Sequence, residues 1–150
     1  MGLGRVRLKT LAPEHAKIAP YLRQEDKDEI KALSGLSPET AVAFSIASSQ
    51  TGYAAYYDGE LTAIFGISGD EIWLVGTDII TEHPVTFFRV SRKIFHELSK
   101  GYEYLHNCVD ARNKLHLRWL KWLGFTIEEA MYMGAEGMPF HHVFWIRDRK

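Results

Sequence analysis

The residues NKLHLRWLKWLGF, positions 113–125 of this 150-residue chain, say most about its fold. Apolar side chains recur there at helical spacing and Gly124 is a typical helix stop, so an amphipathic helix is predicted at 114–123. The apolar run just before it, at 102–109, predicts a buried strand. A strand followed by such a helix indicates a sheet covered by helices.

Upstream of this unit the chain changes its hydrophobic period. Asp58-Gly59 is a strong two-residue turn signal between two strand-like runs, which predicts a β-hairpin. His83-Pro84 opens a segment whose apolar residues recur at helical spacing. The other predicted elements are a strand at 5–11, two or three helices within 13–48, strands at 53–57, 61–67 and 71–75, and a final hairpin from 126–133 and 141–147.

The order of these elements, β-α-α-β-β-β-α-β-α-β-β, predicts an α/β (α+β) fold. We expect a mixed central sheet of six to seven strands flanked by about four helices. At 150 residues the chain is expected to form a single domain over residues 1–150.

Composition excludes several classes of protein. Hydrophobic residues make up 46% and charged residues 25%, which excludes wholesale disorder. A net charge of −1 gives no case for nucleic-acid binding. The single cysteine, Cys108, excludes an internal disulfide and is interpreted as a buried hydrophobe. No apolar run is long enough to span a membrane, and no signal peptide is expected.

Charge is distributed unevenly along the chain. Residues 12–82 hold twelve acidic and four basic residues, a net of −8, whereas residues 89–121 hold eight basic and three acidic residues, a net of +5. This split suggests one face that repels anions and another that holds one. The alternative is two oppositely charged halves that attract each other within the fold.

Asn113 is followed by a helix and then by Gly124-Phe125, eleven and twelve residues on. This spacing and the element order resemble the Gcn5-related N-acetyltransferase (GNAT) superfamily. A narrower resemblance covers most of the chain: it is similar to small phage acetyltransferase-like proteins, the internal virion protein A group of T7-like phages. That second resemblance is carried by residues 22–30, Gly35, Gly76-Thr77-Asp78, His83-Pro84 and 113–125.

The resemblance implies a phage-type N-acyltransferase that transfers an acetyl group from acetyl-CoA to an amine by direct attack. Its implied partners are acetyl-CoA and an amine acceptor, one candidate being a host protein, with host cytoplasm or virion as the location. The resemblance assigns to the cofactor the backbone groups of Leu74 to Thr77, which include Val75, Gly76 and Thr77, and a donor near Asn113. Arg89 and Arg92 could supply charge to its phosphates; the alternative is a solvated basic face.

Four residues are candidates for proton transfer. Glu25, Asp26 and Glu29 lie, by resemblance, on the acceptor side, and Asp26 and Glu29 at i and i+3 can raise each other's pKa. These carboxylates could instead only attract a cationic amine or form a solvated face. The family's usual acid, a Tyr seven residues after the Asn, is Leu120 here, so His116 is the nearest titratable group.

Two departures from the family keep a second interpretation open. The segment 78–86, where the superfamily has a glycine-rich phosphate loop, contains no glycine, and Pro84 lacks an N–H. With the Tyr also absent, the alternative is a non-catalytic GNAT-fold phage protein that acts as an internal virion component or binds a host factor, with a homodimer as one assembly. No metal site is expected, because the adjacent His141 and His142 point to opposite faces of a strand.

Overall fold

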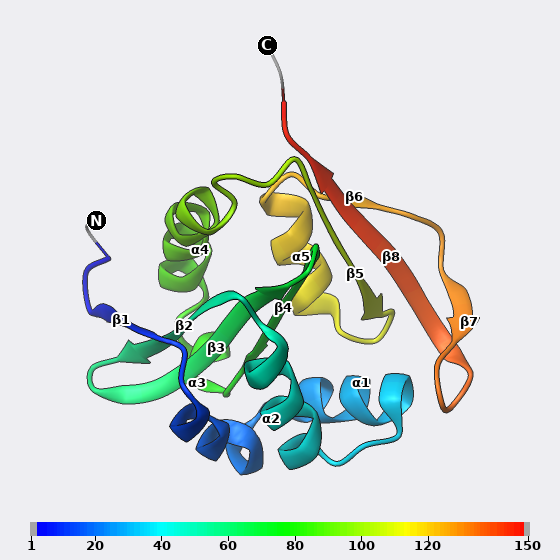
Figure 1. Cartoon of the computed structure of the whole chain (residues 1–150), viewed down its shortest axis with the longest axis horizontal. Coiled ribbons are helices and arrows are strands. Elements are labelled where there is room, and N and C mark those ends of the chain that lie inside the picture. Colours follow the sequence, from blue (N-terminus) through cyan, green and yellow to red (C-terminus); the bar gives the residue numbers. More distant parts are fainter. Residues whose placement is uncertain (1–2, 149–150) are drawn as a thin grey trace.

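The computed structural model describes residues 3–148, so Met1, Gly2, Arg149 and Lys150 lie outside the described residues. Six helical segments occur in this part of the chain (Figure 1): η1 Pro13–Tyr21, α1 Gln24–Ser34, α2 Pro38–Ser48, α3 Ile79–Glu82, α4 Pro84–Leu98 and α5 Lys114–Trp122. The strands are β1 Val6–Thr10, β2 Thr51–Tyr57, β3 Glu60–Ser68, β4 Glu71–Gly76, β5 Tyr104–Asp110, β6 Thr126–Ile127, β7 Met131–Met133 and β8 Met138–Ile146.

All eight strands belong to one sheet, ordered β1-β2-β3-β4-β5-β8-β6, with β7 also paired to β8. The β4–β5 pair is parallel and the other pairs are antiparallel. The predicted hairpin turn is confirmed at Asp58-Gly59, where both residues have positive φ, 49° and 84°. The predicted mixed sheet flanked by helices is therefore confirmed.

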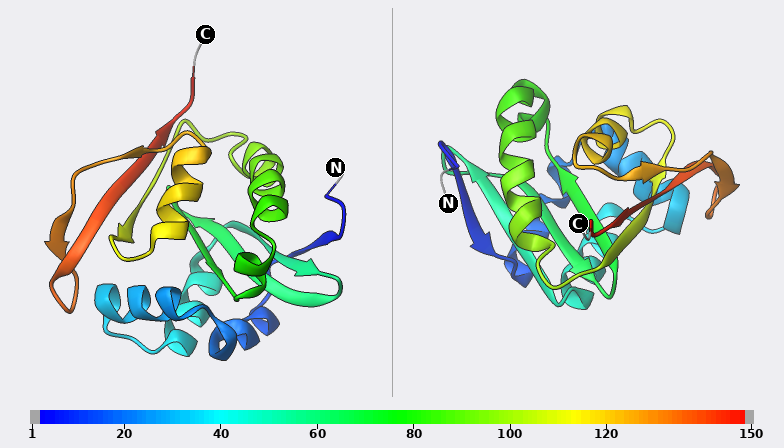
Figure 2. Two further views of the ribbon diagram at one scale, coloured as in Figure 1. Left: turned by 180° about the vertical axis from the view of Figure 1, so that it is seen from behind. Right: turned by 90° about the horizontal axis from the view of Figure 1, so that it is seen from above.

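The two faces of the sheet are covered by different helices (Figures 1 and 2). Ala55 and Phe65 belong to the larger core cluster, on the side of α4 and α5. Their strand neighbours Ala54 and Ile64 belong to the second cluster, with η1 and α2. This alternation is the period of a strand that is buried on both faces.

The sheet opens between its two parallel strands. β4 and β5 share a single register pair, Glu71 with His106, whereas β5 and β8 pair along their whole length. Next to that pair, the Asn107 side-chain amide donates to the Ile72 carbonyl at 2.6 Å. Beyond it, Gly76 of β4 hydrogen-bonds to α1 rather than to β5, which leaves a V-shaped opening at the carboxyl ends of the two strands.

Three details differ from the expectations. The first helix is a 3-10 helix, η1, and the short helix α3 precedes the predicted α4. The expected strand at 126–133 is divided into β6 and β7, because residues 128–130 have no register partner on β8, although the Glu128 N–H still donates to the His142 carbonyl. This division brings the strands of the described chain to eight.

The turn between β7 and β8 holds the carboxyl end of α1 in place. The Ala135 and Glu136 N–H groups donate to the carbonyls of Leu33 and Ala32. Gly134 has a φ of +81°, and a Cβ atom added there would lie 2.6 Å from the Ala32 oxygen. The hairpin thus positions the helix that carries the acidic residues of the site.

We expect Gly134→Ala to lower the free energy of unfolding by about 2–3 kcal/mol, because strain at positive φ adds to a clash with backbone. Gly137→Ala is the matched control: its φ is +62°, but an added Cβ meets no atom within 4 Å. It should cost only about 1 kcal/mol. Urea unfolding of both variants measures the difference; equal losses would mean that the approach to α1 does not matter.

Candidate active site

A buried polar network joins α1 to the ends of β4 and α5. Asp26 Oδ2 accepts a hydrogen bond from the Gly76 N–H at 2.9 Å. Asp26 Oδ1 accepts from Arg23 Nη1 at 3.2 Å and from Asn113 Nδ2 at 3.0 Å. Asp26, Arg23 and Asn113 are 1%, 4% and 0% exposed, so this charge pair is held away from water.

Arg23 is the centre of this network. Its backbone N–H donates to the Gly76 carbonyl at 2.9 Å, so α1 takes both the donor and the acceptor of that glycine. Its guanidinium also approaches Asn113 Oδ1 and forms an ion pair with Glu25 at 3.4 Å, whose side chain is half exposed. Asn113 therefore bridges the Arg23–Asp26 pair, and its amide is used within the protein.

Glu29 and His116 lie beside this network at the opening of the sheet. Glu29 Oε1 accepts from the Asp110 N–H at 2.7 Å, and Oε2 lies 4.0 Å from His116 Nδ1. Burial raises the pKa of Glu29 to about 8, with a further contribution from the charge of Asp26. Burial also lowers the pKa of His116, whose Nδ1 has no hydrogen-bond partner among the described residues. The pair is thus a carboxyl that titrates near neutral pH beside a neutral imidazole.

A groove of about 350 Å³ leads to Glu29 and His116. It lies on the α1 and α2 side of the sheet, and its floor includes Trp73, Val75 and Cys108. Acidic and aromatic side chains on its walls are suited to a cationic amine. Burial raises the pKa of the Cys108 thiol, which argues against a thiolate nucleophile there.

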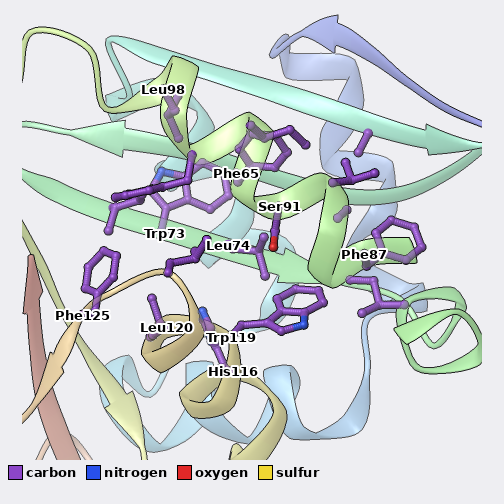
Figure 3. A pocket seen from close by; sticks show the side chains of 18 of the residues that line it. Phe65, Trp73, Leu74, Phe87, Ser91, Leu98, His116, Trp119, Leu120 and Phe125 are labelled. Carbon is purple, nitrogen blue, oxygen red and sulfur yellow. The ribbon is translucent and has the colours of Figure 1, made fainter. Parts of the chain in front are cut away.

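A second hollow lies on the other face of the opening, between the sheet, α4 and α5 (Figure 3). Its volume is about 90 Å³ and its lining is apolar apart from Ser91 and His116. Five residues line both hollows and separate the groove from the cavity: Ile72, Trp73, Leu74, His116 and Leu120.

Leu74 is the residue of β4 whose backbone faces this opening. The Thr77 N–H donates to the Thr62 carbonyl of β3. Hydrogen-bonding direction alternates along a strand, so the backbone N–H and C=O groups of residues 72, 74 and 76 face away from β3. The Ile72 carbonyl and both Gly76 groups are taken by Asn107, Asp26 and Arg23. Among the described residues, none of these contacts uses the Leu74 groups.

A basic hollow of about 520 Å³ lies at the first turns of α4, lined by Pro84, Val85, Phe88, Arg89, Arg92, Lys93 and Trp122. The Arg92 guanidinium lies 4.2 Å from the Trp122 ring centre, a cation–π contact between α4 and α5. Asp78 and Glu82 line a different hollow, with Lys17 and Tyr21 of η1. The acidic residues of the segment 78–86 are therefore turned away from the basic hollow.

The structure brings together some of the residues that the sequence singled out. Asp26, Glu29, Asn113 and His116 converge at the opening, and Asp26, Glu29 and His116 place one ligand-capable atom each within 4.8 Å of one another. Glu25 stays at the edge and contacts Arg23 only through its ion pair. The remaining candidates, Val75, Gly76, Thr77, Arg89 and Arg92, lie at the end of β4 and on α4.

One contributor was not predicted from the sequence, the Asp110 N–H that orients Glu29. A backbone group carries no residue signature, so only the tertiary structure reveals it. The backbone groups of Leu74 to Thr77 were expected at the cofactor, and Leu74 lines both hollows. The ion pair of Arg23 does have a sequence signal, because this basic residue precedes four carboxylates within seven positions.

A mixed sheet that opens between two parallel strands, with α1 and α2 on one face and α4 and α5 on the other, is the fold of the GNAT acetyltransferases. The chain is similar to a GNAT-family acetyltransferase from Streptococcus pneumoniae, with a TM-score of 0.66, 12% identity, and 95% of this chain and 99% of that chain covered. The ribosomal-protein-S5-alanine acetyltransferase from Vibrio fischeri gives a TM-score of 0.65 and 12% identity, with 99% and 96% covered. The microcin C7 self-immunity acetyltransferase, solved in complex with acetyl-CoA and AMP, gives 0.65 and 11% identity, with 97% and 94% covered.

A protein-family comparison places the chain more narrowly. The family model described as bacteriophage T7, probable scaffold protein Gp13, matches residues 53–131, which is more than half of the chain. The chain belongs to this family. No curated protein matches the sequence. None of the helices among residues 3–148 is long and apolar enough to cross a lipid bilayer.

Proposed function

We propose that this phage-family protein is an acetyl-CoA-dependent N-acetyltransferase in which Glu29 is the general base. The observation that carries the proposal is the position of Glu29: a carboxyl that is only 14% exposed, with a pKa raised to about 8, lies where β4 and β5 part, at the inner end of an open groove. The host cytoplasm or the virion is the proposed location, and a host protein is the proposed source of the amine.

The residues around the opening fit acetyl-CoA in chemical type. Arg89 and Arg92, with the exposed first turn of α4, offer cationic and N–H donors to phosphates. The Leu74 backbone offers a donor and an acceptor to an amide-containing arm. The apolar cavity between them has a volume of about 90 Å³ and is the proposed place of this arm.

When bound, acetyl-CoA would supply the acetyl thioester that the amine attacks. The groove attracts the amine in its cationic form through Glu71, and through Glu29 when that carboxyl is ionised. Glu29 in its ionised form then removes a proton from the ammonium, and its pKa near 8 makes that transfer accessible close to neutral pH. The Asp110 N–H holds Glu29 Oε1 in place, and neutral His116 closes the inner wall without adding a competing charge.

The first test is thermal unfolding of the full chain with and without acetyl-CoA. A ligand at about 100 times its Kd adds about 2.7 kcal/mol of stability, which for a chain of this size is a shift of roughly 5–10 °C. Arg89→Ala combined with Arg92→Ala should remove most of the shift, whereas Arg118→Ala, an exposed cation on α5, should leave it intact. Adenosine bisphosphate serves as the reference for the phosphate contacts alone.

The outcome separates this proposal from a second candidate, a GNAT-fold virion component or host-factor-binding protein without catalysis. That candidate is favoured by the description of its family as a probable scaffold and by the engagement of both Gly76 backbone groups with α1. No shift at saturating acetyl-CoA would reject the enzyme and favour the second candidate. A shift, followed by release of free thiol with an amine panel, would support the enzyme.

A further inference from the structure

Four side chains form a continuous chain on β5 and β8, next to the groove described above but not among the residues that line it. Asp70 Oδ1 lies 3.0 Å from His106 Nε2, His106 Nδ1 lies 3.1 Å from His142 Nε2, and His142 Nδ1 lies 2.5 Å from Glu128 Oε1. His106 is on β5 and His142 on the neighbouring β8, while Asp70 is in the β3–β4 turn and Glu128 follows β6.

The backbone fixes these four residues relative to one another. The His106 N–H donates to the Asp70 carbonyl at 3.0 Å, and the Glu128 N–H donates to the His142 carbonyl at 2.9 Å. Each carboxylate is therefore anchored to the histidine that it contacts. Tyr104 stacks on His106, with 5.3 Å between ring centres, and Phe144 stacks on His142. Both imidazole rings are therefore also held in orientation.

The carboxylates set the protonation of the outer ring nitrogens. A carboxylate oxygen only accepts hydrogen bonds, so His106 Nε2 and His142 Nδ1 must carry the N–H. In neutral imidazoles the two inner nitrogens are then both bare lone pairs that face each other at 3.1 Å. Two lone pairs at hydrogen-bond distance repel each other unless a cation lies between them.

We propose that His106 and His142 form a binding site for a divalent transition-metal ion of the Zn²⁺ type. Two nitrogens bound to one tetrahedral zinc lie about 3.3 Å apart, close to the 3.1 Å separation in this structure. Imidazole is a preferred ligand of Zn²⁺, Cu²⁺ and Ni²⁺. A histidine that binds such an ion commonly donates its other ring N–H to a carboxylate, which fixes the orientation of the ring. Asp70 and Glu128 fill that role.

The site is open to solvent, so an ion can enter and water can complete its coordination. The side chains of His106 and His142 are 25% and 35% exposed. The cluster of Asp26, Glu29 and His116 is a poorer cation site, because the Arg23 guanidinium already lies 3.2 Å from Asp26. The bound ion would link β5 to β8 directly, and through the two carboxylates it would link the β3–β4 turn to Glu128.

The test is calorimetric titration of the chelator-treated full chain with ZnCl₂, with Co²⁺ absorption as a second readout. We expect one ion per chain, loss of saturable binding in His106→Gln and in His142→Gln, and affinity at least tenfold weaker in Asp70→Asn and Glu128→Gln. His96→Gln, an exposed histidine on α4, should bind as the parent does. Thermal unfolding of each variant without metal checks that it is folded.

Two results would overturn the proposal. If the parent chain binds no Zn²⁺ at 100 times the protein concentration, a shared proton bridges the two rings instead. If His106→Gln and His142→Gln retain binding and His116→Gln loses it, the ion occupies the cluster at Glu29. Neither result depends on acetyl transfer, so the metal site and the proposed enzyme stand or fall separately.

Discussion

Asp26→Ala is expected to lower the free energy of unfolding by about 3–5 kcal/mol, because it leaves a buried guanidinium without its counter-ion. Arg23 is 4% exposed and forms two ion pairs, of which only the one with Asp26 has a buried carboxylate. The substitution also removes the acceptor for the Gly76 N–H and for the Asn113 amide. Two further buried donors are thereby left unpaired, which adds to the loss.

Glu25→Ala is the matched control for this prediction, because Glu25 pairs with the same guanidinium from a half-exposed position. An exposed ion pair contributes less than about 1 kcal/mol, so this variant should unfold close to the parent. Urea unfolding at pH 7 compares the two. A loss below 1 kcal/mol for Asp26→Ala, or equal losses for both variants, would show that the network does not hold α1 against β4.

Glu29→Gln is expected to reduce kcat of the proposed acetyl transfer by about 10²–10⁴-fold, the usual contribution of a general base. The amide keeps the shape of the side chain and an oxygen to accept the Asp110 N–H, but it takes up no proton. The free energy of unfolding should instead increase at high pH, because glutamine carries no charge at this position. Burial makes the charged form of Glu29 unfavourable and raises its pKa to about 8.

The same variant makes the pH dependence of stability a direct readout of Glu29. The pKa of Glu29 is the ordinary 4.5 in the unfolded chain and about 8 in the folded one. Between these two values the folded state binds more protons than the unfolded state, so the free energy of unfolding falls as the pH rises. His116 opposes this only below its ordinary pKa of 6.5, because burial lowers its pKa. Between pH 6.5 and pH 8 the parent should therefore lose about 2 kcal/mol relative to Glu29→Gln.

Urea unfolding at half-unit pH steps measures both curves. Parallel curves from pH 6.5 to pH 8 would mean that the pKa of Glu29 is not raised, and the proposed base would lose its basis. His116→Gln is the companion variant: it should keep the decline above pH 6.5, because Glu29 is intact in it.

Local sequence patterns were sufficient to predict most of the framework. Asp58-Gly59 adopts the positive φ values that its hairpin turn requires, and the helix predicted at 114–123 is present as α5, Lys114–Trp122. Patterns failed where the sheet set the outcome: residues 126–133 were predicted as one strand, but their pairing to β8 is interrupted and they form β6 and β7. Pairing depends on the partner strand, which a local period does not contain.

The candidate site divides in the same way. Residue type and helical spacing, which are local, predicted that Asp26 and Glu29 share one face of α1 and that His116 lies on α5. Tertiary structure alone brings Glu29 within 4.0 Å of His116 and seats Asp26 on Gly76, because these contacts join segments 87 and 50 residues apart. The strand period already predicted that His141 and His142 point to opposite faces. Only the tertiary structure brings His142 next to His106, since cross-strand register places these two side chains on one face.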